Sequence, residues 1–455
     1  MSTNALDRLW RGWGDLDGQK VRFQSLFFVH FVAFSGFVVF RNVYLGEMGM
    51  SGSAMGRIGF LMTAAGVAAQ PLWGLVTDYL RAERPVLVVA AAVSAVGLLA
   101  YPAADGLAEP FLLVAAGTVA FSVFHAPIVP IANGLVLSRG YDYGRVRAFG
   151  SIAFGIGSLG FGFLVAALGI ASIVYVYALG MVVLAGVVWT LPRSAGDADE
   201  VDAAGPRGRD GAGGGDGVGG EDGSGPGGRD ESGGENADEA GDPPLSSAVR
   251  TLATNGDFLV VLLVAFVVGL SIRGGSSFFS VYMRAVEASA VVGPWTLSPD
   301  ALTGVAWTVK TLFETVAFVY ALRLTGSHKA FLVAGGAGVA LPQVVYGLTS
   351  APWAIVAVQV VGGLGYGLFN LAVVNIVFAV AADRVTSTAQ TALTGLGMGL
   401  GGAVGQVVAG ELSDALGIQR MYLYLAAAGF VGAAIGLAVR STSADGSAGP
   451  TGEAA

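Results

Sequence analysis

The chain has 455 residues, of which 54% are hydrophobic and 12% are charged, and its formal net charge is −8. Soluble domains average about one quarter charged residues, so this composition indicates a protein whose main solvent is a lipid bilayer. The absence of cysteine excludes disulfides, and the three histidines have no metal-ligand spacing. No GxxxxGK[ST] phosphate loop is present, so we do not expect the chain to use bound ATP.

The acidity of the chain is concentrated in one segment. Residues 193–250 contain 14 acidic and 5 basic residues, and the remainder is close to neutral. The segment is rich in glycine, aspartate and glutamate, and its few apolar residues cannot offset the entropy of ordering a backbone. We predict a flexible linker over 192–247. We interpret its acidity as an adaptation to a salty cytoplasm, typical of a halophile, rather than as a binding feature.

Strongly apolar sequence lies on both sides of the linker, in segments of about 20 residues, the length that crosses a bilayer. After a tail over 1–21, the first half, 22–191, has such segments at 22–45, 54–80, 85–104, 110–137, 148–168 and 171–191. The second half, 248–440, has them at 257–284, 300–324, 329–349, 352–382, 386–411 and 420–440, before a tail over 441–455. We predict an all-α membrane protein of twelve transmembrane helices in two pseudo-symmetric six-helix halves.

The basic residues indicate the orientation. If both termini lie inside, 18 of the 24 lysines and arginines fall on the inner ends and loops, and four fall outside. We therefore expect a multi-pass protein of the cell membrane with both termini and the linker in the cytoplasm.

Glycine is concentrated in the fifth and eleventh spans, which occupy the same place in their halves. Small residues let helices approach closely in lipid, and the matching positions indicate an internal repeat. The two GxGxxG matches in these spans follow no strand, so we do not interpret them as dinucleotide sites.

Several motifs resemble the major facilitator superfamily. Gly74, Asp78 and Arg84 match its loop between the second and third helices, whereas Tyr79, Arg81 and Glu83 depart from it. The segments QPLWG (70–74), FHAPIVP (124–130) and YGRVRAFGS (143–151) resemble the branch of proton symporters for lactose, phenylpropionate and nucleosides. The segments 304–314 and 389–406 resemble the eighth and eleventh helices of that branch.

The resemblance implies the major facilitator fold, and it implies conformational or gate roles for Gly74, Asp78, Arg84, Arg145 and Arg147. Arg147 corresponds to an arginine that partners the sugar-binding glutamate of the lactose transporters. That glutamate is missing here, because 126–133 contains no acid. Galactoside binding is therefore not expected.

Charged residues inside a span are costly, and they indicate function when they face the bundle interior. Lys310 and Glu314 in the eighth span share a helical face, either as a mutually neutralising pair or as a substrate and coupling site. Arg273 in the seventh span either binds a ligand or caps carbonyls where Gly274 and Gly275 loosen the helix.

The remaining candidates are polar residues in the first, fourth and tenth spans. His30 and His125 are either packing residues or proton carriers, and a proline beside His125 should bend its helix. Arg41 lies near a span end, where a side chain can snorkel to the interface. Asn133 and Asn370 bind either a ligand or a neighbouring helix.

The balance of these charges favours an anionic solute. Two cations, Arg273 and Lys310, face one acid, Glu314, and a carboxylate would complete the balance. Nearby aromatic residues suit a ring-bearing solute: Phe278, Phe279, Tyr282 and Trp307. We therefore expect a secondary active transporter that moves a small organic solute by alternating access, with the resemblance and Glu314 pointing to proton symport.

Other readings stay open. One is an uncoupled facilitator or exporter of a sugar or nucleoside, with Glu314 only neutralising Lys310, and another is a non-transporting membrane sensor. No nucleophile–base or metal constellation suggests an enzyme. The expected partners are the solute, a coupling proton or sodium ion and the lipid bilayer. We expect a monomer that uses no cofactor and binds no nucleic acid.

Overall fold

The computed structural model describes residues 18–80, 82–138, 143–191, 245–321, 327–381 and 385–440. The predicted linker and both predicted tails lie almost wholly outside these ranges. Within them, twelve helical spans are long and apolar enough to cross a membrane. The predicted fold of twelve transmembrane helices is therefore confirmed.

In the described residues, the first half contains six spans built from eight helices. They are α2 (Gly18–Glu47), α3 (Gly52–Leu80), α4 (Glu83–Leu98), α5 (Ala100–Ala104), α6 (Phe111–His125), α7 (Ile128–Ser138), α8 (Tyr143–Leu168) and α9 (Ser172–Thr190). The fourth span breaks between α6 and α7, directly after His125, where Pro127 lacks the N–H that a continuous helix needs. The helix is therefore interrupted at the point where the sequence predicted a bend.

The second half repeats the six spans and adds a short sheet. Its elements are α11 (Leu245–Thr254), α12 (Gly256–Ala285), β1 (Ala290–Val292), β2 (Trp295–Leu297), α13 (Pro299–Ala321), α14 (His328–Leu348), α15 (Pro352–Ala357), α16 (Gln359–Val380), α17 (Thr386–Ala392), the π-helix η2 (Leu393–Leu400), α18 (Gly401–Leu416) and α19 (Ile418–Gly436). β1 and β2 pair antiparallel, with Val291 opposite Thr296. The sequence analysis anticipated neither this hairpin nor the π-helix in the glycine-rich eleventh span.

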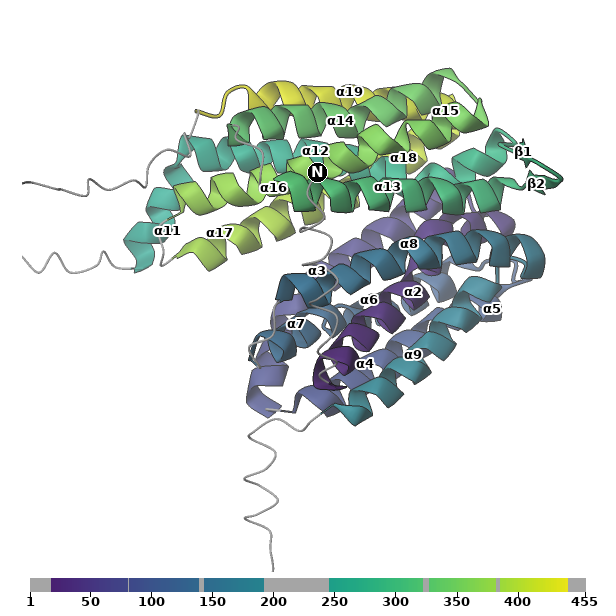
Figure 1. Cartoon of the computed structure of the whole chain (residues 1–455), viewed down its shortest axis with the longest axis horizontal. Coiled ribbons are helices and arrows are strands. Elements are labelled where there is room, and N and C mark those ends of the chain that lie inside the picture. Colours follow the sequence, from purple (N-terminus) through teal and green to yellow (C-terminus); the bar gives the residue numbers. More distant parts are fainter. Residues whose placement is uncertain are drawn as a thin grey trace, which may run out of the picture.

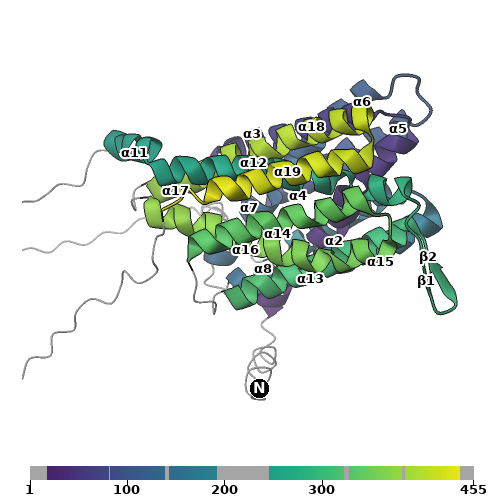
Figure 2. The same cartoon turned by 90° about the horizontal axis from the view of Figure 1, so that it is seen from above.

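The spans of both halves run between two ends of the bundle (Figure 2). We call the end that holds β1 and β2 the hairpin end. We call the opposite end, where α11 lies and α19 finishes, the terminal end. Because the number of spans is even, α2 begins and α19 ends at the same end of the bundle, as the predicted topology requires.

The two halves pack side by side along two equivalent seams (Figure 1). α3 of the first half lies against α18 of the second, and α8 of the first lies against α13 of the second. α3 and α13 are the second spans of their halves, and α8 and α18 belong to the fifth spans. The same two positions therefore meet twice, as expected for pseudo-symmetric halves. Between the seams, α2 packs against α12.

Glycine brings the seam helices to backbone contact. A Cβ added at Gly162 on α8 would lie 2.6 Å from the carbonyl oxygen of Asp300, and one at Gly304 on α13 would lie 2.6 Å from that of Ser158. At the other seam, a Cβ at Gly52 would lie 2.8 Å from the Gly410 oxygen. Contact this close requires residues without a side chain, which explains part of the glycine enrichment in the fifth and eleventh spans.

The described hydrogen bonds between the halves lie between the hairpin end and the middle of the bundle. Asp414 on α18 accepts hydrogen bonds from the backbone N–H groups of Gly52 (2.7 Å) and Ser53 (2.8 Å), which begin α3. A carboxylate at a helix N-terminus pairs with N–H groups that lack helical partners. Arg284 on α12 forms an ion pair with Glu47 of the first half at 2.6 Å. In this conformation the bundle is therefore closed at its hairpin end.

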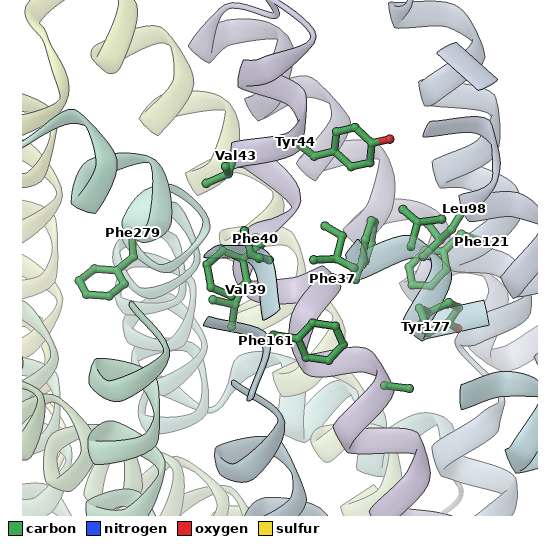
Figure 3. Packing of buried hydrophobic residues seen from close by; sticks show 14 of the residues in the cluster. Phe37, Val39, Phe40, Val43, Tyr44, Leu98, Phe121, Phe161, Tyr177 and Phe279 are labelled. Carbon is green, nitrogen blue, oxygen red and sulfur yellow. The ribbon is translucent and has the colours of Figure 1, made fainter. Parts of the chain in front are cut away.

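The buried core around α2 joins the first half to the second. Figure 3 shows Phe37 on the side of Phe121 and Tyr177, and Phe40 on the side nearer Phe279 of α12. The Phe37 and Phe121 rings are 5.0 Å apart and nearly edge to face. α2 is thus packed from both sides, which fixes the position of the polar residues that it carries.

Candidate functional site

The second half contains a narrow pocket between α12, α13, α14 and α15–α16. Its wall is formed by Ile272, Gly275, Ser276, Phe279, Trp307, Lys310, Val339, Pro342, Gln343, Tyr346, Gln359 and Gly362. The free volume is about 40 Å³, enough for a few water molecules but not for a larger solute. Residues from four spans meet here, so a change in helix packing would change the size of the pocket.

Lys310 is the charged residue of the pocket wall. Its Nζ lies 4.6 Å from the centre of the Trp307 ring and 5.7 Å from that of Tyr366, so two aromatic faces hold the ammonium group. Glu314, one turn further along α13, and Arg273 on α12 are both close enough to interact with Lys310 electrostatically. The predicted pair of Lys310 and Glu314 is thus part of a cluster with a third charge from another helix.

Glycines on α16 explain how this segment of α13 is held. A Cβ at Gly363 would lie 2.9 Å from the backbone nitrogen of Glu314, and one at Gly367 would lie 3.2 Å from its carbonyl oxygen. α16 therefore packs directly against the backbone that carries Lys310 and Glu314. The two side chains project from a rigid helix pair, as a preorganised site requires.

Two neutral polar groups in the pocket wall lack partners. The indole Nε1 of Trp307 and the Oε1 of Gln343 are buried and form no hydrogen bond with the described residues. The Nε2 of Gln343 donates to Ser271 Oγ at 2.7 Å, which orients the amide. A buried donor or acceptor without a partner is costly, so these groups are suited to a ligand or water in the pocket.

Arg273 projects from an unbroken helix. Its side chain is exposed, and a Cβ at Gly402 of α18 would lie 2.6 Å from its Cγ. α12 continues through Gly274 and Gly275, whose missing side chains make room for Gly405 of α18 and Gln343 of α14. The interpretation of Arg273 as a cap on a loosened helix is therefore wrong, because these glycines serve helix packing.

Arg41 does not snorkel to the interface. Its side chain is 3% exposed and donates hydrogen bonds to Asn42 Oδ1 (3.0 Å), Met62 Sδ (3.0 Å) and Gln406 Oε1 of α18 (3.1 Å). The sequence predicted an interfacial residue from position alone, but α18 packs against α3 and brings Gln406 onto the guanidinium. Arg41 is also within electrostatic range of Arg273. The middle of the bundle therefore concentrates positive charge.

His30 and His125, far apart in sequence, lie together in the first half. Their ring centres are 4.9 Å apart and the rings are stacked. Phe34 stacks on His125 at 4.2 Å and Phe121 at 4.9 Å. The Nδ1 of His125 is 3.0 Å from the hydroxyl of Tyr177. The sequence identified each histidine separately but gave no sign that they touch.

The remaining predicted residues are not brought to the pocket. Asn370 donates from Nδ2 to the carbonyl of Tyr366 on its own helix at 2.9 Å. Asn133 has a buried Oδ1 that forms no hydrogen bond with the described residues. Gly74 is exposed on α3, and Arg84 is half-buried on α4. The side chains of Asp78, Arg145 and Arg147 lie outside the described residues.

The predicted aromatic lining divides into two groups. Phe279 and Trp307 line the pocket, whereas Phe278 is fully buried away from it. Tyr282 is also buried, and it donates to the carbonyl of Thr349 at 2.7 Å. Tyr346 and Gln359 also line the pocket, joined by a 2.5 Å hydrogen bond from the Gln359 amide to the tyrosine hydroxyl. Nothing in the sequence pattern distinguished these two residues from ordinary packing residues.

Residues 21–424 match the MFS_1 like family. The chain is 26% identical over 441 residues to a maltose permease of Geobacillus stearothermophilus, covering 92% of this chain and 94% of the permease. It is 28% identical over 145 residues to a probable 3-phenylpropionic acid transporter of Escherichia coli, covering 31% of this chain and 37% of that protein.

The nucleoside transporter NupG has a similar structure, with a TM-score of 0.71 and 15% sequence identity, over 92% of this chain and 98% of that chain. The family match, the relatives and the twelve spans in two halves agree with one another. The chain therefore belongs to the MFS_1 like family and is a membrane transporter of the major facilitator type.

Proposed function

We propose that this transporter carries a small organic anion of the carboxylate class, which binds at the pocket beside Lys310. One observation carries the proposal. Lys310 lines the pocket with Arg273 in electrostatic range, and Glu314 is the one acid among the described groups that interact strongly with it. A carboxylate solute would pair with Lys310 in the pocket and bring a negative charge to a cluster that has one more cation than acid.

The neutral groups of the pocket fit the same class of solute. The ammonium group of Lys310 and the Nε1–H of Trp307 are donors for carboxylate oxygens, and the free Oε1 of Gln343 is an acceptor for a hydroxyl or amine. The rings of Phe279 and Trp307 offer flat apolar surfaces for a ring or an alkyl chain. We infer a solute with one carboxylate and an apolar or aromatic body.

Transport follows by alternating access. The halves, closed at the hairpin end here, rock along the α3–α18 and α8–α13 seams, so that the site opens to one side and then to the other. We place both termini and the linker in the cytoplasm, because the basic residues gather at that side. Glu314 is the proposed coupling carboxylate: it is ionised when paired with Lys310 and takes a proton when the pair separates. The transporter would then be a monomeric proton symporter of the cell membrane.

A second candidate solute is an uncharged sugar. The likeness to a maltose permease over 92% of this chain favours it, and aromatic rings beside the amides of Gln343 and Gln359 are suited to sugar hydroxyls and ring faces. An uncharged solute leaves the surplus positive charge of the cluster without compensation. For that reason we rank the sugar below the carboxylate.

Thermal unfolding of the purified protein tests the choice. A ligand that binds the folded state stabilises it by about 2.7 kcal/mol at a concentration 100 times its Kd. We expect 3-phenylpropionate to raise Tm in the wild type and not in Lys310→Gln, whereas maltose and a nucleoside have no effect. Stabilisation by maltose that survives in Lys310→Gln, with none by carboxylates, would overturn the proposal in favour of the sugar.

A further inference from the structure

The histidine pair of the first half is outside the pocket and has no part in the function proposed above. His125 ends α6, and its ring is enclosed by His30 and Phe34 from α2, Phe121 from its own helix and Tyr177 from α9. This environment is unusual for a packing residue, because a chain of hydrogen bonds begins at Nδ1 of the His125 ring.

The direction of each bond in that chain can be deduced. Ser94 Oγ lies 2.9 Å from the carbonyl of Ala91, which can only accept, so the single hydroxyl hydrogen of Ser94 goes there. Tyr177 OH lies 2.9 Å from Ser94 Oγ and must therefore donate to it. The oxygen of Tyr177 then accepts from His125 Nδ1 at 3.0 Å. This is the one arrangement in which all three contacts are hydrogen bonds.

His125 is consequently fixed as its Nδ1–H tautomer, and the lone pair of a neutral ring is on Nε2. A partner that holds one nitrogen of a histidine as a donor makes the other nitrogen a defined proton acceptor, as in sites where histidine works as a base. A residue that served only packing would need no such orientation.

We infer that His125 is a second proton-binding residue of the transport cycle, held in its accepting tautomer by Tyr177 and Ser94. A hydronium ion gives its proton to the lone pair of Nε2, so that an N–H bond forms and water is left, while the hydrogen bond from Nδ1–H to Tyr177 is unchanged. The inference about the tautomer stands alone, whereas the role in transport rests on the proposed function.

The surroundings of His125 limit the site to one proton. Among the described side chains that contact it, the titratable groups are His30 from α2 and Tyr177 from α9, and Phe121 from α6 is apolar. Ser94 of α4, which contacts Tyr177, is neutral. Two imidazolium rings stacked at 4.9 Å would repel each other strongly in a low dielectric, so the pair binds a single proton. An anionic solute bound at the pocket of the second half would stabilise that proton electrostatically, and by reciprocity the proton would favour solute binding.

Nitrogen-15 NMR of the histidine-labelled protein tests the tautomer without any solute. The chain has only three histidines, and His30→Gln and His328→Gln assign their signals. We expect neutral His125 to carry its proton on Nδ1. In Ser94→Ala the hydroxyl of Tyr177 is free to donate to His125 Nδ1, so the proton should move to Nε2. The matched control is Ser122→Ala. The Ser122 hydroxyl is buried one turn from His125 and forms no hydrogen bond with the described residues, so its removal should leave the tautomer unchanged.

Acidification of the wild type should then protonate both ring nitrogens of His125, and 3-phenylpropionate should move the midpoint of that change to higher pH. Any of three results would overturn the inference. These are a wild-type His125 with its proton on Nε2, a His125 ring that stays neutral until the protein unfolds, and a midpoint that 3-phenylpropionate does not move. If Ser94→Ala does not fold, Tyr177→Phe gives the same readout, with a mixture of tautomers expected. The thermal test with Lys310→Gln addresses the anion site separately, so the two proposals can fail independently.

Discussion

The second spans of the two halves occupy equivalent positions but have different chemistry. α13 carries Lys310 and Glu314 at the level of the pocket, whereas α3 has Thr63 and Gln70 in its interior and keeps its charged residues, Arg57 and Asp78, near its ends. Both helices pack against a glycine-rich partner across a seam. Both copies therefore make the same close contacts across a seam, and in the described residues α13 carries charges in mid-helix whereas α3 does not. We propose that the charges of α13 bind an anion.

A second contrast lies between the polar groups of the two halves. In the second half, Lys310 shares a pocket with a buried donor on Trp307 and a buried acceptor on Gln343, neither of which has a hydrogen-bond partner among the described residues. This arrangement suits a ligand that enters from outside. In the first half, His125, Tyr177 and Ser94 bind one another in an ordered chain, an arrangement that suits a proton. The three predictions that follow test this division of roles, from the largest expected effect to the smallest.

Replacing Glu314 by glutamine should abolish proton-driven accumulation of solute while exchange of labelled for unlabelled solute continues. The amide imitates the protonated carboxyl, and exchange needs no net proton movement. Both activities are measured in proteoliposomes from one preparation, with Glu411→Gln on the exposed face of α18 as a control that should retain both. Loss of exchange together with accumulation and stability would instead identify Glu314 as the structural counter-charge of Lys310.

Replacing Gly162 by valine should reduce transport by about tenfold or more. The added side chain would push α8 away from the carbonyl of Asp300, and overpacking of this kind costs about 1–3 kcal/mol. Gly160→Val is the matched control on the same helix: a Cβ there meets nothing within 4 Å, so transport should stay close to that of the wild type. Equal effects of the two substitutions would show that the α8–α13 seam is not where the halves close.

Replacing Asp414 by asparagine should raise the fraction of molecules that are open at the hairpin end, by less than about threefold. The effect is small because exposed electrostatic contacts contribute little. The rate at which a thiol reagent labels Ser280→Cys measures this opening. The Ser280 hydroxyl is buried between the halves and donates to the carbonyl of Val39 at 2.7 Å, so a thiol there is reached when the halves separate. The chain has no native cysteine, so labelling at this position has no background. The assigned contact would be contradicted if the cysteine were labelled more slowly in the double variant with Asp414→Asn than in Ser280→Cys alone.

The sequence was sufficient for features that depend on local composition. It predicted the twelve spans from apolar length, an irregularity beside His125 from the following proline, and glycine faces in the fifth and eleventh spans that permit close helix approach. It also placed Lys310 and Glu314 on one face of a span, since that needs only helical spacing. These features depend on neighbours in the chain, so the amino-acid order alone determines them.

Features that depend on packing between distant helices were not predictable in the same way. Arg41 seemed interfacial from its position, and only the approach of Gln406 on α18 buries it. His30 meets His125 because α2 and α6 pack together, which no sequence spacing reveals. The pocket joins Trp307 and Gln343 from separate helices, and although the sequence predicted Trp307 as a lining residue, it gave no sign that these two side chains meet.

The most direct test of an anion site at Lys310 compares two solutes that differ only in charge. Binding of 3-phenylpropionate and of its uncharged amide would be measured by calorimetry on the wild type, on Lys310→Gln and on Lys329→Gln, a lysine at the terminal end of α14. A charge-assisted contact is worth about 1.5–3 kcal/mol, so we expect Lys310→Gln to weaken binding of the carboxylate by about tenfold to a hundredfold. Binding of the amide should be nearly unchanged by that substitution, and Lys329→Gln should change neither. If Lys310→Gln weakens both solutes equally, or weakens neither, the pocket does not recognise the solute by its charge.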